Sequence, residues 1–107
     1  IAGAVAPDYV EKVTDESMKV PLYIWRNIIS ALLRADYNSE LGNIKAPALI
    51  LWGNRDAVCT LEEQLVLRNN IKNGSFIEYR ETGHALHWEH SKRFAEEITM
   101  FILSLGR

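Results

Sequence analysis

The chain has 107 residues, of which 48% are hydrophobic and 24% charged, and its formal net charge is −2. This composition excludes wholesale disorder, and the length suits one small domain. No basic run or stripe stands out, and no apolar run approaches the roughly 20 residues of a membrane helix, so we expect no nucleic-acid or membrane partner.

One cysteine, Cys59, excludes an internal disulfide framework and a multi-cysteine metal site. Residues 1–10 lack the basic start and apolar core of a signal peptide, and a cytoplasmic location is favoured, although nothing identifies the compartment. The sequence begins at Ile1 rather than Met, so we expect either a processed chain or a piece of a longer protein.

Two helices are expected before residue 36. Pro7 can open a short helix that ends near Ser17. Pro21 breaks that helix, because proline is tolerated only in the first turn of the next one. From residue 21 to about residue 35 the apolar side chains recur every three or four positions, which is the spacing of one helical face. They are Leu22, Ile24, Trp25, Ile28, Ile29, Leu32 and Leu33.

The segment after these helices is polar, with one helical turn possible at residues 39–41. A continuous apolar run, residues 48–52, then lies between Pro47 and Gly53. Runs of this length without alternation are typical of strands that are buried on both faces in a parallel sheet.

A helix and a second strand follow. Thr60 and Glu63 have the spacing of a capping box, which predicts a helix from there to about Lys72, with Gly74 as a left-handed cap. Residues 75–80 alternate in part and predict a strand. A strand, a helix and a second strand in this order predict two parallel strands.

The end of the chain is expected to be a loop over residues 81–90 and a helix over residues 91–105, with Ser91 as its N-cap. Two short parallel strands do not form a stable sheet alone, and the first needs neighbours at its edge. We therefore expect the chain to be the last portion of a larger doubly wound α/β sheet, or to pair with a second copy through the open sheet edge.

An acid and an imidazole follow the two strands. Asp56 lies in the turn after the first strand and His84 in the loop after the second. Because working residues of open α/β sheets lie at the carboxyl ends of the strands, a carboxylate there can fix one imidazole nitrogen and leave the other as a base. The alternatives are that Asp56 is an ordinary turn residue and that His84 is a hydrogen-bonded loop histidine.

The surrounding sequence resembles a known family. Residues 46–56 (APALILWGNRD) resemble the penultimate strand and acid turn of the α/β-hydrolase fold family, and residues 82–89 (TGHALHWE) resemble its histidine loop. The last helix is also similar. The resemblance implies an α/β fold that is the C-terminal part of this architecture, with residues 1–44 as the end of a helical cap and residues 45–107 as a βαβα part of the core.

The resemblance also implies function. Asp56 would be the acid of a catalytic triad and His84 its base, and the substrate would be a small organic ester or a related molecule. Residues 19–33 resemble cap helices of the haloalkane dehalogenase, epoxide hydrolase and carbon–carbon hydrolase branch. The residues that we expect to contact substrate are Trp25, Trp52, Val58 and Leu86.

One departure from the family bears on activity. No G-x-S-x-G motif is present, and none of the serines has glycine flanks. Without a nucleophile and oxyanion-hole donors the largest catalytic contributions are missing, so we expect this chain to be inactive alone. A non-catalytic module that dimerises or binds a partner is the alternative.

No metal or cofactor is expected. His84, His87 and His90 form H-x-x-H-x-x-H, but Gly83 and the loop context argue against the helix that would bring them together. Cys59 lies three residues after Asp56, and a small buried side chain is the favoured interpretation over a nucleophile.

Overall fold

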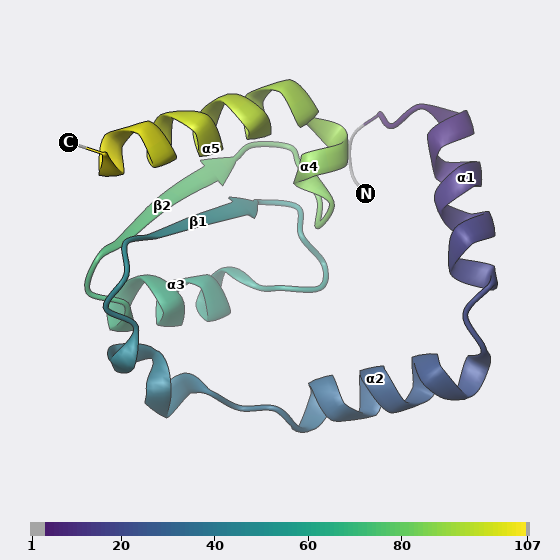
Figure 1. Ribbon diagram of the computed structural model, residues 1–107, viewed down its shortest axis with the longest axis horizontal. Helices are drawn as coiled ribbons and strands as arrows, with labels where there is room; N and C mark the ends of the chain where they lie inside the picture. Colours follow the sequence, from purple (N-terminus) through teal and green to yellow (C-terminus); the bar gives the residue numbers. More distant parts are fainter. Residues whose placement is uncertain (1–3, 107) are drawn as a thin grey trace. The chain divides into compact units, whose positions relative to one another are not determined.

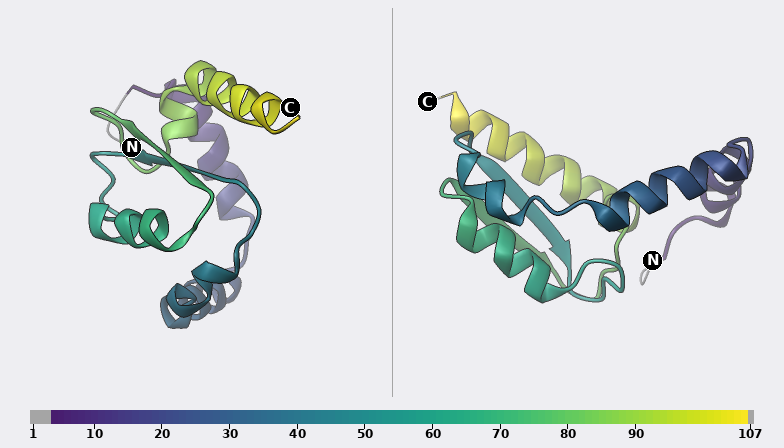
Figure 2. Two further views of the ribbon diagram at one scale, coloured as in Figure 1. Left: turned by 90° about the vertical axis from the view of Figure 1, so that its left-hand side faces the viewer. Right: turned by 90° about the horizontal axis from the view of Figure 1, so that it is seen from below.

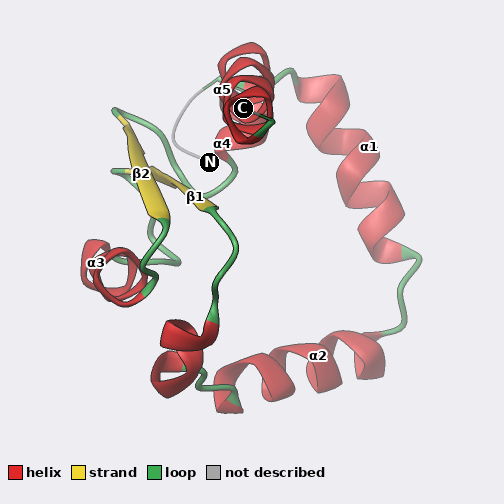
Figure 3. Cartoon of the chain, turned by 60° about the vertical axis from the view of Figure 1, so that its left-hand side comes forward, coloured by secondary structure: helices red, strands yellow, loops and turns green. Residues whose placement is uncertain are grey.

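A computed structural model describes residues 4–106. The described residues form two compact units, Val5–Tyr37 and a second unit that begins at Asn38. Figures 1 and 3 show helices in both units and the two strands in the second. None of the helices in this part of the chain is both long and apolar enough to cross a membrane.

The first unit contains two helices, as the sequence predicts. Helix α1 spans Pro7–Met18, with a proline in its first turn, and helix α2 spans Leu22–Arg34, with Pro21 at its N-cap. The indole Nε1 of Trp25 donates to the carbonyl oxygen of Ser17 at 3.2 Å, which ties α2 to the end of α1. Neither helix contains a buried residue, and most of the apolar face of α2 is exposed.

The second unit is built on a parallel pair of strands. Strand β1 (Ala48–Gly53) pairs with strand β2 (Gly74–Tyr79) along its whole length. Helix α3 (Leu61–Asn70) crosses over between them, and helix α5 (Ser91–Leu105) lies on the opposite face of the sheet from α3 (Figures 1 and 2). The predicted parallel strand–helix–strand unit and the terminal helix are confirmed.

The core lies between the strands and these helices. The buried apolar side chains come from the strands, from the end of the crossover helix and from the segments before β1 and after β2. They are Leu41, Ile50, Trp52, Ile71, Tyr79, Ala85 and Leu86. Leu41 belongs to a 3-10 helix, η1 (Asn38–Asn43), which includes the turn expected at residues 39–41. The side chain of Tyr79 is fully buried, and its hydroxyl donates to the carboxylate of Glu97 on α5.

Three local predictions are wrong. Gly74 is not a left-handed cap: α3 ends because Ile71 is already extended, and Gly74 is the first residue of β2. The loop at residues 81–90 contains a single helical turn, α4 (Leu86–Glu89). Only His90 separates α4 from α5, so the N-cap position falls on His90 and Ser91 is already helical. The capping box of Thr60 and Glu63 is present as predicted.

Candidate active site

The loops after β1 and β2 are bonded to each other through their main chains. The N–H of Asn54 donates to the carbonyl oxygen of Tyr79 at 2.9 Å, and the N–H of Arg55 donates to that of Thr82 at 2.8 Å. A Cβ added at Gly53 would collide with the carbonyl oxygens of Thr82 and Gly83. Glycine at position 53 therefore lets the acid turn lie directly against the histidine loop.

Asn54 fastens the start of the histidine loop with its side chain. Its Oδ1 accepts from the N–H of Glu81 at 2.8 Å, and its Nδ2 donates to Oε1 of Glu78 at 3.0 Å. Glu81 has a φ of 53°, in the left-handed region that few residues other than glycine adopt. The hydrogen bond from Asn54 holds this turn, a role that sequence reasoning missed. An asparagine directly after a strand was the available signal.

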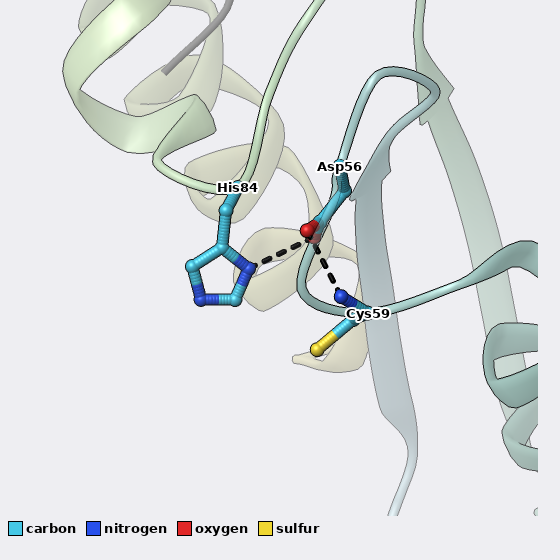
Figure 4. A group of neighbouring side chains, drawn as sticks. All are labelled: Asp56, Cys59 and His84. Atoms are coloured by element: carbon cyan, nitrogen blue, oxygen red, sulfur yellow. Dashed lines mark hydrogen bonds and ion pairs between the residues drawn. The ribbon is translucent and has the colours of Figure 1, made fainter.

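Asp56 and His84 meet at the carboxyl edge of the sheet. His84 Nδ1 lies 2.9 Å from Asp56 Oδ2, while Oδ1 accepts from the main-chain N–H groups of Val58 at 2.8 Å and Cys59 at 3.0 Å (Figure 4). The Asp56 side chain is 6% exposed and that of His84 is 54% exposed. The structure therefore brings together the two residues that the sequence singled out.

The environment keeps Asp56 ionised. Burial by itself raises the pKa of this carboxyl, but the hydrogen bonds from Cys59, His84 and Val58 and the charge of His84 outweigh it, so the pKa is lowered overall. An ionised carboxylate can only accept, so Nδ1 of His84 carries the proton that it shares. The other ring nitrogen, Nε2, points away from Asp56 and can act as an acceptor (Figure 4).

Helix α4 supports the histidine loop from its other end. The N–H of Gly83, next to His84, donates to the two carboxylate oxygens of Glu89 at 3.1 and 3.3 Å. The buried hydroxyl of Thr82 donates to the carbonyl oxygen of Arg80 and lies 2.9 Å from His90 Nε2. Glu89 and His90 are thus positioning residues that sequence analysis missed, because it placed this segment in an irregular loop.

Cys59 lies beside the Asp56–His84 pair. A carboxylate oxygen of Asp56, the Sγ of Cys59 and a ring nitrogen of His84 all lie within 4.8 Å of one another. Cys59 is half-buried, and burial together with the charges of Asp56 and Glu63 raises the pKa of its thiol. A raised pKa disfavours the thiolate that a cysteine nucleophile would need.

The predicted substrate contacts are spread over several environments. Trp52 is buried and donates through Nε1 to the carbonyl oxygen of Cys59 at 2.8 Å. Val58 is exposed on the acid turn, and Leu86 is buried in α4. Trp25 belongs to the first unit, where it lines a hollow of about 490 Å³ with Tyr9 and Val13 of α1 and with Val20 of the segment between the helices. Contact of these four residues with a substrate stays a prediction.

The histidines of the H-x-x-H-x-x-H stretch are held apart by their partners. His87 packs against the rings of Trp88 and Phe94, whereas His90 lies against Thr82 and the ring of Tyr79. Within residues 4–106, the group of three potential metal ligands that contains His84 consists of His84, Asp56 and Cys59, and it includes neither of the other two histidines.

Comparison with known proteins points to hydrolases. No protein-family model matches the chain. A 2-hydroxy-6-oxononadienedioate/2-hydroxy-6-oxononatrienedioate hydrolase of Paraburkholderia phymatum is 37% identical over 67 residues, which are 63% of this chain and 23% of that protein. A 2-hydroxy-6-oxo-6-phenylhexa-2,4-dienoate hydrolase of Burkholderia cepacia is 29% identical over 100 residues, which are 94% of this chain and 31% of that protein. The chain thus spans less than a third of either relative.

A solved structure shares the fold. An α/β hydrolase from the metagenome of lagoon sediments at Mar Chica, Morocco, superposes with a TM-score of 0.74 at 20% identity, covering 97% of this chain and 48% of that one. The chain therefore shares its fold with about half of that protein. The described residues therefore have the fold of part of an α/β hydrolase, and the curated proteins that the sequence resembles are hydrolases.

Proposed function

We propose that this chain carries the acid and base of a catalytic triad, Asp56 and His84, in a hydrolase that cleaves a carbon–carbon bond of a 2-hydroxy-6-oxo-dienoate. The 2.9 Å contact between His84 Nδ1 and Asp56 Oδ2 is the observation that carries the proposal. The substrate class comes from the names of the curated relatives, which are hydrolases of such acids. Among the chemistries that the sequence resemblance leaves open, these names favour carbon–carbon hydrolysis over hydrolysis of a small ester.

The chemistry would use both nitrogens of His84. Nε2 accepts a proton from a nucleophilic hydroxyl or from water, and Asp56 stabilises the resulting imidazolium through Nδ1. The nucleophile becomes bonded to the C6 carbonyl carbon, and the bond between that carbon and the dienol fragment breaks. The imidazolium then supplies the proton that the departing carbon fragment needs. Where the nucleophile is a hydroxyl, water then attacks the ester that has formed, again giving a proton to Nε2, and the carboxylic acid leaves as the hydroxyl takes that proton back. In sum, water is added across the broken carbon–carbon bond.

The nucleophile would come from outside these 107 residues, because no serine here lies in a G-x-S-x-G stretch. We propose that the remainder of an α/β-hydrolase sheet supplies it, together with the oxyanion-hole donors. Two observations support this: this chain covers only 48% of the solved hydrolase, and the apolar side chains of α2 are exposed. The cap assignment of residues 1–44 belongs to the same proposal.

The test uses the protein in which this chain continues from the nucleophile-bearing part of the fold. His84→Ala and Asp56→Asn should each lower kcat on a 2-hydroxy-6-oxo-dienoate by about 10⁴-fold, as removal of a triad member does elsewhere. His87→Ala, which alters a ring contact away from Asp56, is the matched control and should keep most of the activity. Undiminished turnover in Asp56→Asn would contradict the proposal.

The isolated 107-residue chain gives a second test. We expect no turnover of a p-nitrophenyl ester above background, since the nucleophile and the oxyanion hole are the largest contributors to rate. If the wild-type chain turns over the ester and His84→Ala does not, these 107 residues suffice for catalysis. The proposal that the nucleophile lies outside them would then be wrong.

A further inference from the structure

The group formed by Asp56, Cys59 and His84 combines three kinds of metal ligand in one place. A carboxylate oxygen, a thiol sulfur and an imidazole nitrogen lie within 4.8 Å of one another. Oxygen, sulfur and nitrogen ligands of these types are those that Zn²⁺ takes in proteins. The acid turn also fixes their spacing, because Asp56 Oδ1 accepts from the N–H of Cys59 itself.

We propose that Asp56, Cys59 and His84 bind Zn²⁺, or another thiophilic divalent cation, in place of the hydrogen bond between the carboxylate and the imidazole. The ion would contact Asp56 Oδ2, Cys59 Sγ and His84 Nδ1. The proposal rests on the geometry of this group and not on the hydrolase function proposed above.

The distances require only small movements. Zn–N and Zn–O bonds of about 2.0 Å at a tetrahedral angle put the two ligand atoms about 3.3 Å apart. His84 Nδ1 and Asp56 Oδ2 are now 2.9 Å apart, so they would separate by a few tenths of an ångström. A Zn–S bond of about 2.3 Å puts the sulfur about 3.5 Å from the nitrogen and the oxygen. The ligand atoms of the three residues already lie within 4.8 Å of one another.

The rest of the site is already arranged for an ion. Main-chain N–H groups hold Asp56 Oδ1 and leave Oδ2 facing the histidine, and the indole of Trp52 fixes the carbonyl of Cys59. The side chain of His84 is more than half exposed, so water can reach the fourth position of a tetrahedral ion. The ion displaces the thiol proton into water, and the carboxylate and thiolate then balance its charge.

Occupancy by metal and use of the pair for acid–base chemistry would exclude each other. A metal on Nδ1 replaces the proton that His84 shares with Asp56, so the imidazole loses its carboxylate partner. A bound thiophilic cation would then switch off the pair, and a chelator would restore it.

The experiment titrates the reduced 107-residue chain with Co²⁺, a spectroscopic substitute for Zn²⁺. We expect one Co²⁺ per chain, a thiolate-to-cobalt charge-transfer band and intense tetrahedral d–d bands, all removed by one equivalent of Zn²⁺. Cys59→Ser should abolish the charge-transfer band. His84→Ala should weaken Co²⁺ binding by about 100-fold or more, since even outer partners of metal ligands contribute 10–100-fold. His87→Ala is the matched control and should bind as the wild type does.

Circular dichroism of each variant separates loss of the site from loss of the fold. Since His84 is largely exposed, His84→Ala should keep the wild-type spectrum. Absence of a charge-transfer band in the wild-type chain, or unchanged affinity in folded His84→Ala, would overturn the metal site. Neither result bears on the hydrolase proposal, which turnover by His84 and Asp56 variants tests separately.

Discussion

Gly53 is the residue on which the contact between the two loops of the site depends. A methyl group there would meet the main-chain oxygens of Thr82 and Gly83, which cannot swing away as a side chain can. We expect Gly53→Ala to lower the free energy of unfolding by about 3 kcal/mol and to push the segment that carries His84 away from Asp56. Urea unfolding measures the first effect.

Gly42 offers the control for this substitution. It lies in η1, and an added Cβ would meet nothing within 4 Å. Gly42→Ala should therefore be neutral, or slightly stabilising through the unfolded chain. If Gly53→Ala unfolds at the same urea concentration as Gly42→Ala, the close approach at Gly53 has no energetic weight.

Tyr79 gives the molecule a distinct alkaline behaviour. Burial, the hydrogen bond to Glu97 and the negative charge of Glu97 raise the pKa of its hydroxyl, against the opposing charge of Arg93. A raised pKa in the folded state means that this group stabilises the fold fully below about pH 10, the unfolded value, and that the contribution is lost as pH rises further.

Ultraviolet titration tests this shift. Because folded Tyr79 should stay protonated near pH 10, the absorbance curves of wild type and Tyr79→Phe should coincide until the wild type unfolds. A wild-type curve that exceeds the Tyr79→Phe curve by one tyrosine around pH 10, while circular dichroism still shows the folded chain, would contradict the raised pKa.

At the scale of elements, the capping box sets the start of α3. Thr60 Oγ1 accepts from the N–H of Glu63, and the Glu63 carboxylate accepts from the N–H of Thr60. Thr60→Ala removes the first of these bonds and should cost about 1 kcal/mol of unfolding free energy. Thr99→Ala is the control, because Thr99 is exposed within α5 and bonds only back to Ala95. Equal melting temperatures of the two variants would refute the cap's contribution.

The sequence predicts the elements that have a local cause. A proline near the start of each helix predicts α1 and α2, and apolar residues every three or four positions support α2. The unbroken apolar run predicts β1, and the Thr60–Glu63 spacing predicts the start of α3. The sequence did not predict α4, because a single helical turn is too short to show a helical period. Tertiary hydrogen bonds such as that from Gly83 to Glu89 support it instead.

Part of the candidate site could also be predicted from the sequence, because the strands that position it are visible there. Asp56 and His84 follow strands, and the topology of parallel strands brings such positions to one edge. The roles of Asn54 and Glu89 depend on main-chain groups of the neighbouring loop, which no spacing in the sequence reveals. The position of Cys59 beside His84 likewise follows from how the acid turn folds.

At the scale of the whole molecule, the exposed apolar face of α2 predicts self-association of the isolated chain. Leu33 is 82% exposed, and Leu22, Ile28 and Leu32 are also more than half exposed. Leu33→Lys should shift the chain toward monomer in size-exclusion chromatography with light scattering, because a charge cannot be buried against a second apolar face.

Asn27→Lys provides the matched control, since it adds the same charge on the polar side of α2 and should leave the mass distribution unchanged. A wild-type chain that is monomeric at every concentration and melts cooperatively would contradict both the association and the need of the sheet for a neighbour.

The main-chain bonds between the acid turn and the histidine loop have a mechanical consequence. The main-chain hydrogen bonds of Asn54 and Arg55 join the loops after β1 and β2, so we expect the turn that carries Asp56 and the loop that carries His84 to move together. In the proposed triad, a nucleophile from the remainder of the fold would then be aligned with one structural unit rather than with two independent loops. The geometry of such a triad would depend on one contact, that between the unit carrying Asp56 and His84 and the part of the fold that supplies the nucleophile.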